Sequence, residues 1–271
     1  MKINKIAACT LLACGALGAA QADTIYDSLG PSVPNLPSLG YEATSTSEAG
    51  DRISFAAGAR LLDTVTVRMS SWALASTYGD ANSSFQHQLT FNIYGVGSGA
   101  TAGALLASKT ITADIPYRPE ANPACGQGAT QWMADNGSCY NGMAFDVTFS
   151  FAGLGVVLPD SIVFGLAYNT ADYGADPLHA AGPYNSLNFG LSTGATIGTD
   201  TNADGIFENT TWGPGNLANP DNVGKFMEDT GWRGYVPAVQ INAINEVPEP
   251  GSIALVGVAL AGLGLARRRK A

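Results

Sequence analysis

One stretch of the chain has the residue types and spacing of a cation-binding loop. In "DTNADGIFENTTW", Asp200, Asn202 and Asp204 stand at alternate positions, and a glycine follows directly. Side-chain oxygens spaced in this way can converge on a hard cation, and glycine permits the sharp turn. Glu208 adds an oxygen at the ninth position, but Thr211 replaces the glutamate expected at the twelfth. The pattern favours a solvated turn without a cofactor, with calcium bound by the four acidic and amide side chains as the alternative.

Groups suited to acid–base or nucleophilic catalysis are scarce. His87 and His179 are the only histidines, and no Gly-x-Ser-x-Gly, His-Glu-x-x-His or phosphate-binding glycine motif occurs. A glycosidase needs only two well-placed carboxylates, and 22 acidic residues are available, but no spacing singles out a pair. We therefore expect no catalytic residues and a protein that is not an enzyme, with a secreted glycan-active hydrolase as the alternative.

Tryptophans can bind sugars, because an aromatic ring packs against the apolar face of a pyranose. Trp132, Trp212 and Trp232 fall in segments without strand periodicity, whereas Trp72 ends a predicted strand and is expected in the core. Binding residues are often found in loops. The three loop tryptophans are therefore candidate glycan contacts. Packing is the competing interpretation, and burial of these rings would favour it.

The first 22 residues have the features of a signal peptide. Two lysines precede an uncharged apolar run, and Ala-Gln-Ala at 20–22 follows it. This order is typical of a segment that is cleaved during export. We expect cleavage after Ala22 and a mature chain that begins at Asp23.

Two cysteines remain in the mature chain, Cys125 and Cys139. Two thiols in an oxidising compartment most simply pair with each other, and no histidine lies nearby to complete a zinc site. The pair would close a loop of 13 residues, which stabilises a fold by about 3 kcal/mol. We predict a structural disulfide.

The mature chain is strongly acidic. Between Asp23 and Ala266 it has 22 acidic residues against seven basic ones, a net charge of −15. Such a body is repelled by phosphate backbones, so we expect no nucleic-acid partner.

The elements that must position these residues are strands. Short stretches of apolar alternation recur between clusters of Gly, Asn, Asp and Pro. Val65, Val67 and Met69 alternate with polar residues, as do the apolar residues between Leu89 and Tyr94. This pattern indicates antiparallel strands with one buried face. Strands are predicted at 52–58, 61–74, 87–96, 104–115, 142–151, 160–169, 186–192 and 235–244.

Eight strands without helices predict an all-β domain over residues 23–245, an antiparallel, jelly-roll-like β-sandwich. A closed barrel is the alternative. The proline-rich segment 30–43 is predicted to be an extended arm or sheet edge. Three long connections, 116–141, 169–186 and 193–234, separate the strands. Connections of this length usually carry function.

The last residues, 246–271, form an ordered series of three parts. The uncharged apolar run from Gly251 to Ala266 has 16 residues, so as a helix it reaches ~24 Å against a hydrocarbon core of ~30 Å. The basic cluster behind it keeps that end on the cytoplasmic side. A motif precedes the run and a basic tail closes it: Val247, Pro248, Glu249, Pro250 and Gly251, then Arg267, Arg268, Arg269 and Lys270.

These three parts resemble the PEP-CTERM sorting signal of exported bacterial proteins. The resemblance implies a short transmembrane helix, recognition by the membrane protease exosortase, removal of the tail, and delivery to the surface or extracellular matrix of a Gram-negative-type cell. The opening "DTIYDSLG" and the ending "DTGWRGYVPAVQINA" also resemble the anchor-type domains that accompany this tail. We expect a structural or adhesive protein associated with exopolysaccharide. A carbohydrate-binding module is the first alternative to that role.

Overall fold

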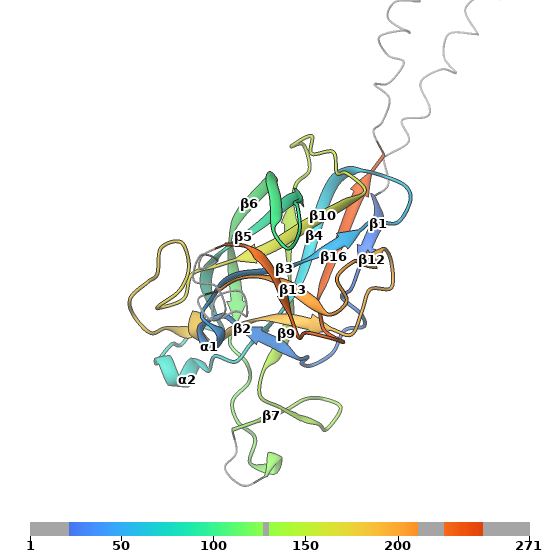
Figure 1. The fold of residues 1–271 in the computed structure, drawn as a ribbon. Helices are drawn as coiled ribbons and strands as arrows, with labels where there is room; N and C mark the ends of the chain where they lie inside the picture. The colour runs from blue at the N-terminus through green and yellow to red at the C-terminus, as the bar shows by residue number, and fades with distance from the viewer. Residues whose placement is uncertain (1–21, 127–129, 211–224, 246–271) are drawn as a thin grey trace, which may run out of the picture.

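Two antiparallel sheets face each other across one apolar core (Figure 1). The computed structural model describes residues 22–126, 130–210 and 225–245. The predicted signal peptide (residues 1–22) lies outside this part except for Ala22, and so does the sorting tail from residue 246. In the described part, no helix is long and apolar enough to cross a membrane. The two separate sheets form the sandwich that the alternation predicts, and not the closed barrel.

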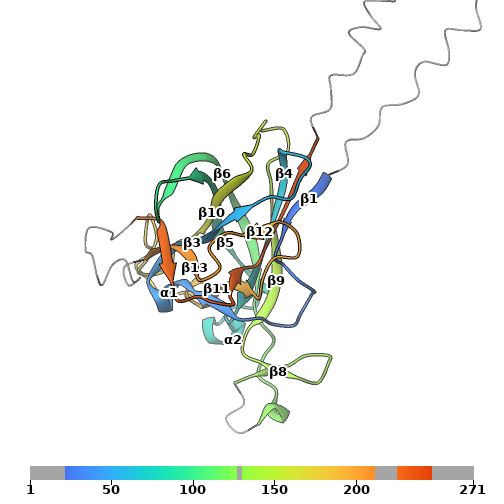
Figure 2. The ribbon, with the colours of Figure 1, turned by 45° about the vertical axis from the view of Figure 1, so that its right-hand side comes forward.

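Sheet A is ordered β1-β16-β4-β11-β15, with β9 beside β4 and β2 beside β11. β1 and β16 pair in antiparallel fashion, with Ala22 opposite Ile244. The two ends of the described body therefore leave the sandwich side by side (Figures 1 and 2). The strands of sheet A are β1 (Ala22–Asp27), β2 (Ser38–Gly40), β4 (Leu61–Ser71), β9 (Met143–Ser150), β11 (Leu187–Ser192), β15 (Val236–Pro237) and β16 (Val239–Ile244).

Sheet B is ordered β14-β13-β3-β10-β5-β6, with β12 beside β3. Single helical turns connect some of the strands: α1 (Tyr41–Thr44), α2 (Ala75–Tyr78), η1 (Pro123–Cys125) and η2 (Pro183–Ser186). The strands of sheet B are β3 (Thr46–Ser54), β5 (Ser84–Val96), β6 (Ala102–Pro116), β10 (Ser161–Ala167), β12 (Thr199–Asp200), β13 (Gly205–Thr210) and β14 (Met227–Thr230).

The core is built from the alternating apolar residues of both sheets. Val65, Val67 and Met69 of β4 are fully buried, and so are Leu89, Phe91 and Ile93 of β5. Across the core, Phe91 of β5 packs against Phe149 of β9 with ring centroids 5.6 Å apart. Each large apolar side chain contributes about 2 kcal/mol when it is removed from water, so the alternation itself drives the two sheets together.

All eight predicted strands are present, but the prediction of an irregular connection at 193–234 is wrong. This segment contains β12, β13 and β14, and Phe207 of β13 pairs with Gly50 of β3. Its strand sequence, "GIFENT", is short and lacks regular alternation. Pairing with β3 therefore determines its conformation more than its own residues do.

The connection 117–142 projects from one end of the sandwich as a finger (Figure 1). It holds a small hairpin of β7 (Trp132–Met133) and β8 (Cys139–Tyr140). The predicted disulfide is confirmed, because Cys125 and Cys139 are bonded and their Cα atoms lie 5.7 Å apart.

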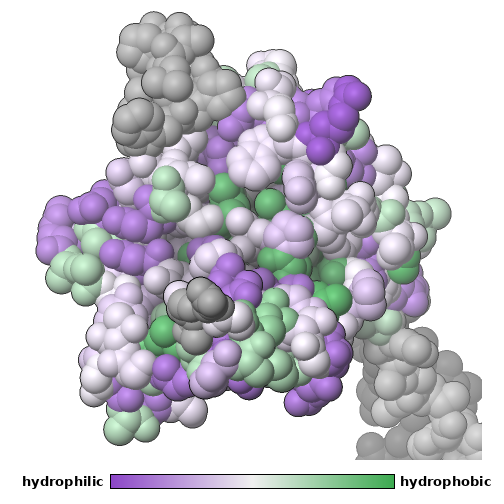
Figure 3. Space-filling model, turned by 90° about the horizontal axis from the view of Figure 1, so that it is seen from below, coloured by the Kyte–Doolittle hydropathy of each residue, from purple (hydrophilic) through white to green (hydrophobic). Residues whose placement is uncertain are grey.

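Seen from below, this end of the molecule shows an apolar area in its middle with hydrophilic side chains around it (Figure 3).

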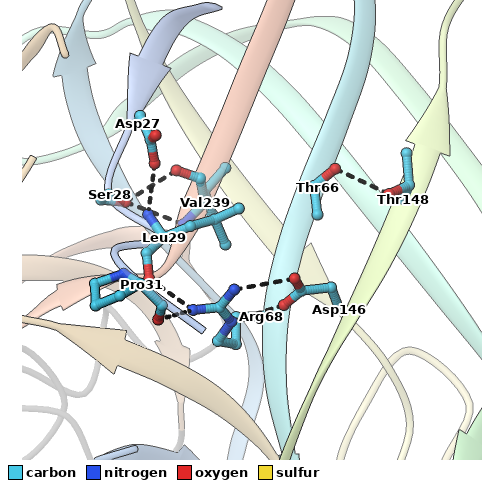
Figure 4. Close-up of polar contacts among 9 residues, drawn as sticks. All are labelled: Asp27, Ser28, Leu29, Pro31, Thr66, Arg68, Asp146, Thr148 and Val239. Carbon is cyan, nitrogen blue, oxygen red and sulfur yellow. Dashed lines mark hydrogen bonds and ion pairs between the residues drawn. The ribbon is translucent and has the colours of Figure 1, made fainter. Parts of the chain in front are cut away.

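A buried arginine ties the proline-rich arm to sheet A (Figure 4). Arg68 of β4 holds Asp146 of β9 with two hydrogen bonds, Nε to Oδ1 at 2.7 Å and Nη2 to Oδ2 at 3.0 Å. Its Nη1 donates to the carbonyl oxygens of Leu29 and Pro31, at 3.0 and 2.7 Å. The guanidinium thereby uses its planar array of donors on two neighbouring segments, and this positions the chain that leads into sheet B.

Replacement of Arg68 by alanine removes all four hydrogen bonds and leaves Asp146 without its cation. We expect the free energy of unfolding to fall by about 2–3 kcal/mol, measured by denaturant titration. Arg233→Ala is the control, because Arg233 pairs with Asp204 at the surface, where both side chains are mostly exposed, and such pairs contribute little. Equal losses in the two variants would contradict the role assigned to Arg68.

Candidate binding cleft on the outer face of sheet B

A polar cleft with a volume of about 860 Å³ lies on the outer face of sheet B. Its floor is formed by β3, β5 and β10, and its walls by the loop 169–178 and the end of β13. Ligand sites in proteins commonly have volumes of roughly 300–1,000 Å³. The cleft is therefore large enough for a small ligand or for a segment of a polymer.

The floor of the cleft is a consequence of strand register. Thr90 of β5 pairs with Ala167 of β10, which pairs with Glu48 of β3, which in turn pairs with Asn209 of β13. Directly paired residues share one face of a sheet, and successive residues alternate between faces. Because the neighbouring positions fill the core, this row of mostly polar residues faces outward.

Glu48 is the most buried acidic group in the cleft, with 8% of its surface exposed. Its Oε1 accepts hydrogen bonds from Asn92 Nδ2 at 2.8 Å and from the Tyr94 hydroxyl at 2.9 Å. Burial raises the pKa of the Glu48 carboxyl, and the two hydrogen bonds oppose that rise. In the described part of the chain, no residue donates to its second oxygen, Oε2.

A glycine makes room for this carboxyl group. A Cβ atom on Gly165 would stand 2.2 Å from Glu48 Oε1. No real side chain tolerates such a separation, so any larger residue at 165 would displace Glu48. The lack of a side chain at Gly165 of β10 therefore determines where the Glu48 carboxyl group lies.

The loop that walls the cleft is held by a neutral histidine. The Nε2 of His87 lies 2.7 Å from the carbonyl oxygen of Asn169, and its ring stacks on Tyr184 at 5.2 Å. Burial lowers the pKa of His87, so the imidazole is uncharged at neutral pH and its Nε2–H donates to the carbonyl. Within the loop, Asn169 Nδ2 donates to the carbonyl oxygen of Asp176 at 2.7 Å.

The charged side chains that line the cleft in the described part of the chain are all acidic. Glu48, Asp172 and Asp176 line it, and no lysine or arginine is found among its lining residues in the described part of the chain. Tyr173, half-buried in the loop, supplies an aromatic ring beside the carboxylates. This arrangement can accept hydrogen bonds from hydroxyl and amino groups and repels anions.

The four predicted calcium ligands do not form one cluster. The Asp204 carboxylate pairs with Arg233, at 2.8 and 3.1 Å, and Asp200 accepts a hydrogen bond from the backbone of Asn202. Glu208 is buried at a distance from this turn along β13. Across the residues that the structure describes, no group of three or more His, Cys, Asp or Glu is placed to hold a metal. Calcium binding stays the untested alternative to a turn without a cofactor.

Glu208 lies instead against a second buried acid, Asp229 of β14. Burial, a hydrogen bond with Asp229 and the charge of that neighbour raise the pKa of Glu208 to about 8. Burial likewise raises the pKa of Asp229, whose Oδ2 accepts a hydrogen bond from Trp232 Nε1 at 3.3 Å. The Glu208 carboxyl therefore holds its proton at neutral pH.

The tryptophans are arranged differently from the prediction. Trp132 is buried with 8% exposed, and its Nε1 donates to Gly142 O at 2.7 Å, so its faces are not open to a sugar. Trp232 packs against the core, and Trp212 lies outside the described residues. Trp72, expected in the core, is 42% exposed, because its ring lies at the end of β4, past the contact between the sheets.

Of the predicted ligands and tryptophans that the structure describes, none lines the cleft. Two sequence signals do point to it. The connection 169–186, identified by its length, provides part of the wall, and the polar positions of the β5 alternation provide part of the floor. No sequence pattern points to Glu48, because only the pairing of the strands shows that it faces outward beside a glycine.

The fold and the cleft together define a β-sandwich domain with a polar site on one sheet. The comparisons with known proteins concern the C-terminus: a family model for the PEP-CTERM protein-sorting motif matches residues 246–270. No curated protein and no solved structure matches the chain. The chain thus carries a PEP-CTERM sorting motif, which implies export, passage through the membrane and exosortase as the processing partner.

The Glu208–Asp229 pair predicts a loss of stability as the pH rises. A carboxyl group whose pKa is raised by folding contributes stability that is complete below its unfolded pKa, near 4.5, and is lost by about pH 8. In Glu208→Gln this titration is absent. The free energy of unfolding should therefore exceed that of the wild type at pH 8, by on the order of 2 kcal/mol.

Denaturant titrations between pH 5 and pH 8 measure this difference. Glu120→Gln, at an exposed position, is the control and should reproduce the wild-type pH profile. Parallel profiles for wild type and Glu208→Gln would show that the pair does not titrate in this range.

Proposed function

We propose that the mature body is a non-enzymatic, polysaccharide-binding protein of the cell surface or extracellular matrix, and that the cleft on sheet B is its binding surface. The observation that carries the proposal is the cleft itself, whose polar floor and single aromatic wall suit the hydroxyl groups and apolar face of a sugar. The role in the matrix is structural or adhesive, and the cleft supplies the contact.

The arrangement of the chain ends supports this role. β1 and β16 lie at one edge of sheet A, whereas the cleft lies on the outer face of sheet B. A body held through its C-terminal end therefore keeps the cleft away from the attachment point. Such a geometry leaves the site accessible to a polymer in the surrounding matrix.

The sorting signal supports delivery to the surface. Deletion of residues 247–271 removes the exosortase recognition motif with its helix and basic tail. We expect the truncated protein to be lost from the surface and matrix fractions and recovered in the periplasm or the medium, as measured by quantitative immunoblotting of cell fractions. Unchanged retention at the surface would contradict delivery through this signal.

Affinity electrophoresis against a panel of neutral, acidic and amine-bearing polysaccharides tests the binding function. Glu48→Gln and Tyr173→Ala should each reduce the affinity about tenfold, the equivalent of about 1.4 kcal/mol, because each removes a contact from the cleft. Trp72→Ala, an exposed aromatic outside the cleft, is the control and should leave the affinity unchanged.

Binding that survives both cleft variants but fails in Trp72→Ala would place the site on the exposed tryptophan instead. Release of reducing ends from a bound polysaccharide, lost in Glu48→Gln, would identify a glycan-active hydrolase and overturn the non-enzymatic part of the proposal.

A further inference from the structure

The cleft presents three carboxyl groups to its ligand without a compensating cation. Glu48 lies at the floor, while Asp172 and Asp176 are exposed on the wall. His87 is the one basic side chain among the lining residues that the structure describes. Burial lowers the pKa of His87 and keeps the ring uncharged at neutral pH, while its Nε2 is engaged by the Asn169 carbonyl.

The carboxyl group of Glu48, at the floor of the cleft, can accept a hydrogen bond from a ligand. Glu48 is more than nine-tenths buried, and Oε1 already accepts from Asn92 and Tyr94. Within the described residues Oε2 has no such partner, and the group lines the cleft. Oε2 is not one of the fully buried side-chain oxygens that lack a partner; it is open to the cleft, where a cationic donor can bind it.

The same charges exclude other ligands. Uronic acids, sulfated sugars and phosphorylated sugars all bring negative charge towards three carboxyl groups, inside a body whose net charge is −15 between Asp23 and Ala266. Like charges brought together at partly buried sites are unfavourable. An anionic polymer therefore does not fit this cleft, although anionic polymers are common in extracellular matrices.

We propose that the ligand of the cleft is a polysaccharide that carries protonated amines, such as a hexosamine polymer from which part of the N-acetyl groups has been removed. This inference rests on the proposed function and specifies its ligand. One ammonium group donates to Glu48 Oε2 at the floor. Asp172 and Asp176 attract neighbouring ammonium groups along the polymer, and the Tyr173 ring packs against a sugar face.

Isothermal titration with three matched probes tests this proposal: a glucosamine oligomer, its fully N-acetylated counterpart, and an oligogalacturonate of the same length. In dilute buffer at mildly acidic pH, where the sugar amines are protonated, the glucosamine oligomer should bind about tenfold tighter than the acetylated one. This preference should shrink as salt is added, because the rim carboxylates are solvent-exposed and screened. The oligogalacturonate should bind weakest.

A pair of charge-matched double variants assigns the preference to the cleft. Asp172→Asn with Asp176→Asn should reduce the preference to about twofold, because the glucosamine oligomer loses more affinity than the acetylated oligomer does. Asp135→Asn with Asp160→Asn changes the net charge equally at exposed positions outside the cleft, and it should retain the full preference. An equal effect of both variants would overturn the assignment to the cleft.

The outcomes separate this inference from the proposed function. Equal affinity for the glucosamine and acetylated oligomers, or tightest binding of oligogalacturonate, overturns the amine preference while polysaccharide binding stands. Failure of every polysaccharide in the wider panel overturns the proposed function itself. Full competition by a simple diamine such as cadaverine would show that the cleft recognises an amine without its sugar, and would also overturn the inference.

Discussion

The pairing register of β3 with β10 and β13 is the constraint on which both the core and the cleft depend. With Gly50 opposite Gly165 and Phe207, Ala49 and Ile53 face the core and Glu48 faces outward. A shift by one residue would move the apolar set to the solvent face and bring the carboxyl of Glu48 into the core. The apolar interior therefore fixes the register, and the register fixes the position of the acid in the cleft.

Sheet B also contains several buried ionisable side chains. Glu48, His87 and the Glu208–Asp229 pair are all buried, and burial shifts the pKa of each in the direction of its neutral form. Such groups lower the stability of the fold relative to apolar residues. Glu48 and His87 each have a place in the cleft. Glu48 supplies a carboxyl group at its floor, and His87 holds the loop that forms its wall.

The strands and the disulfide could be predicted, whereas the site could not. Val65, Val67 and Met69 reveal their strand through a period of two that needs no partner to be visible. β13 has no such pattern, because it is held by its pairing with β3 and β14. The motif at Asp200 to Asp204 has the spacing of a cation loop, but Arg233, 29 residues further along the chain, occupies its last carboxylate.

The sequence by itself determined the route of this protein and its fold class. A sorting signal is recognised as a linear motif, and strand alternation and two cysteines are local properties as well. Only the tertiary structure decided where chemistry can occur. Glu48 belongs to the cleft because β10 brings Gly165 beneath its carboxyl and β5 brings Asn92 and Tyr94 to the same oxygen. These contacts join residues more than 40 positions apart, so no local pattern in the sequence could specify them.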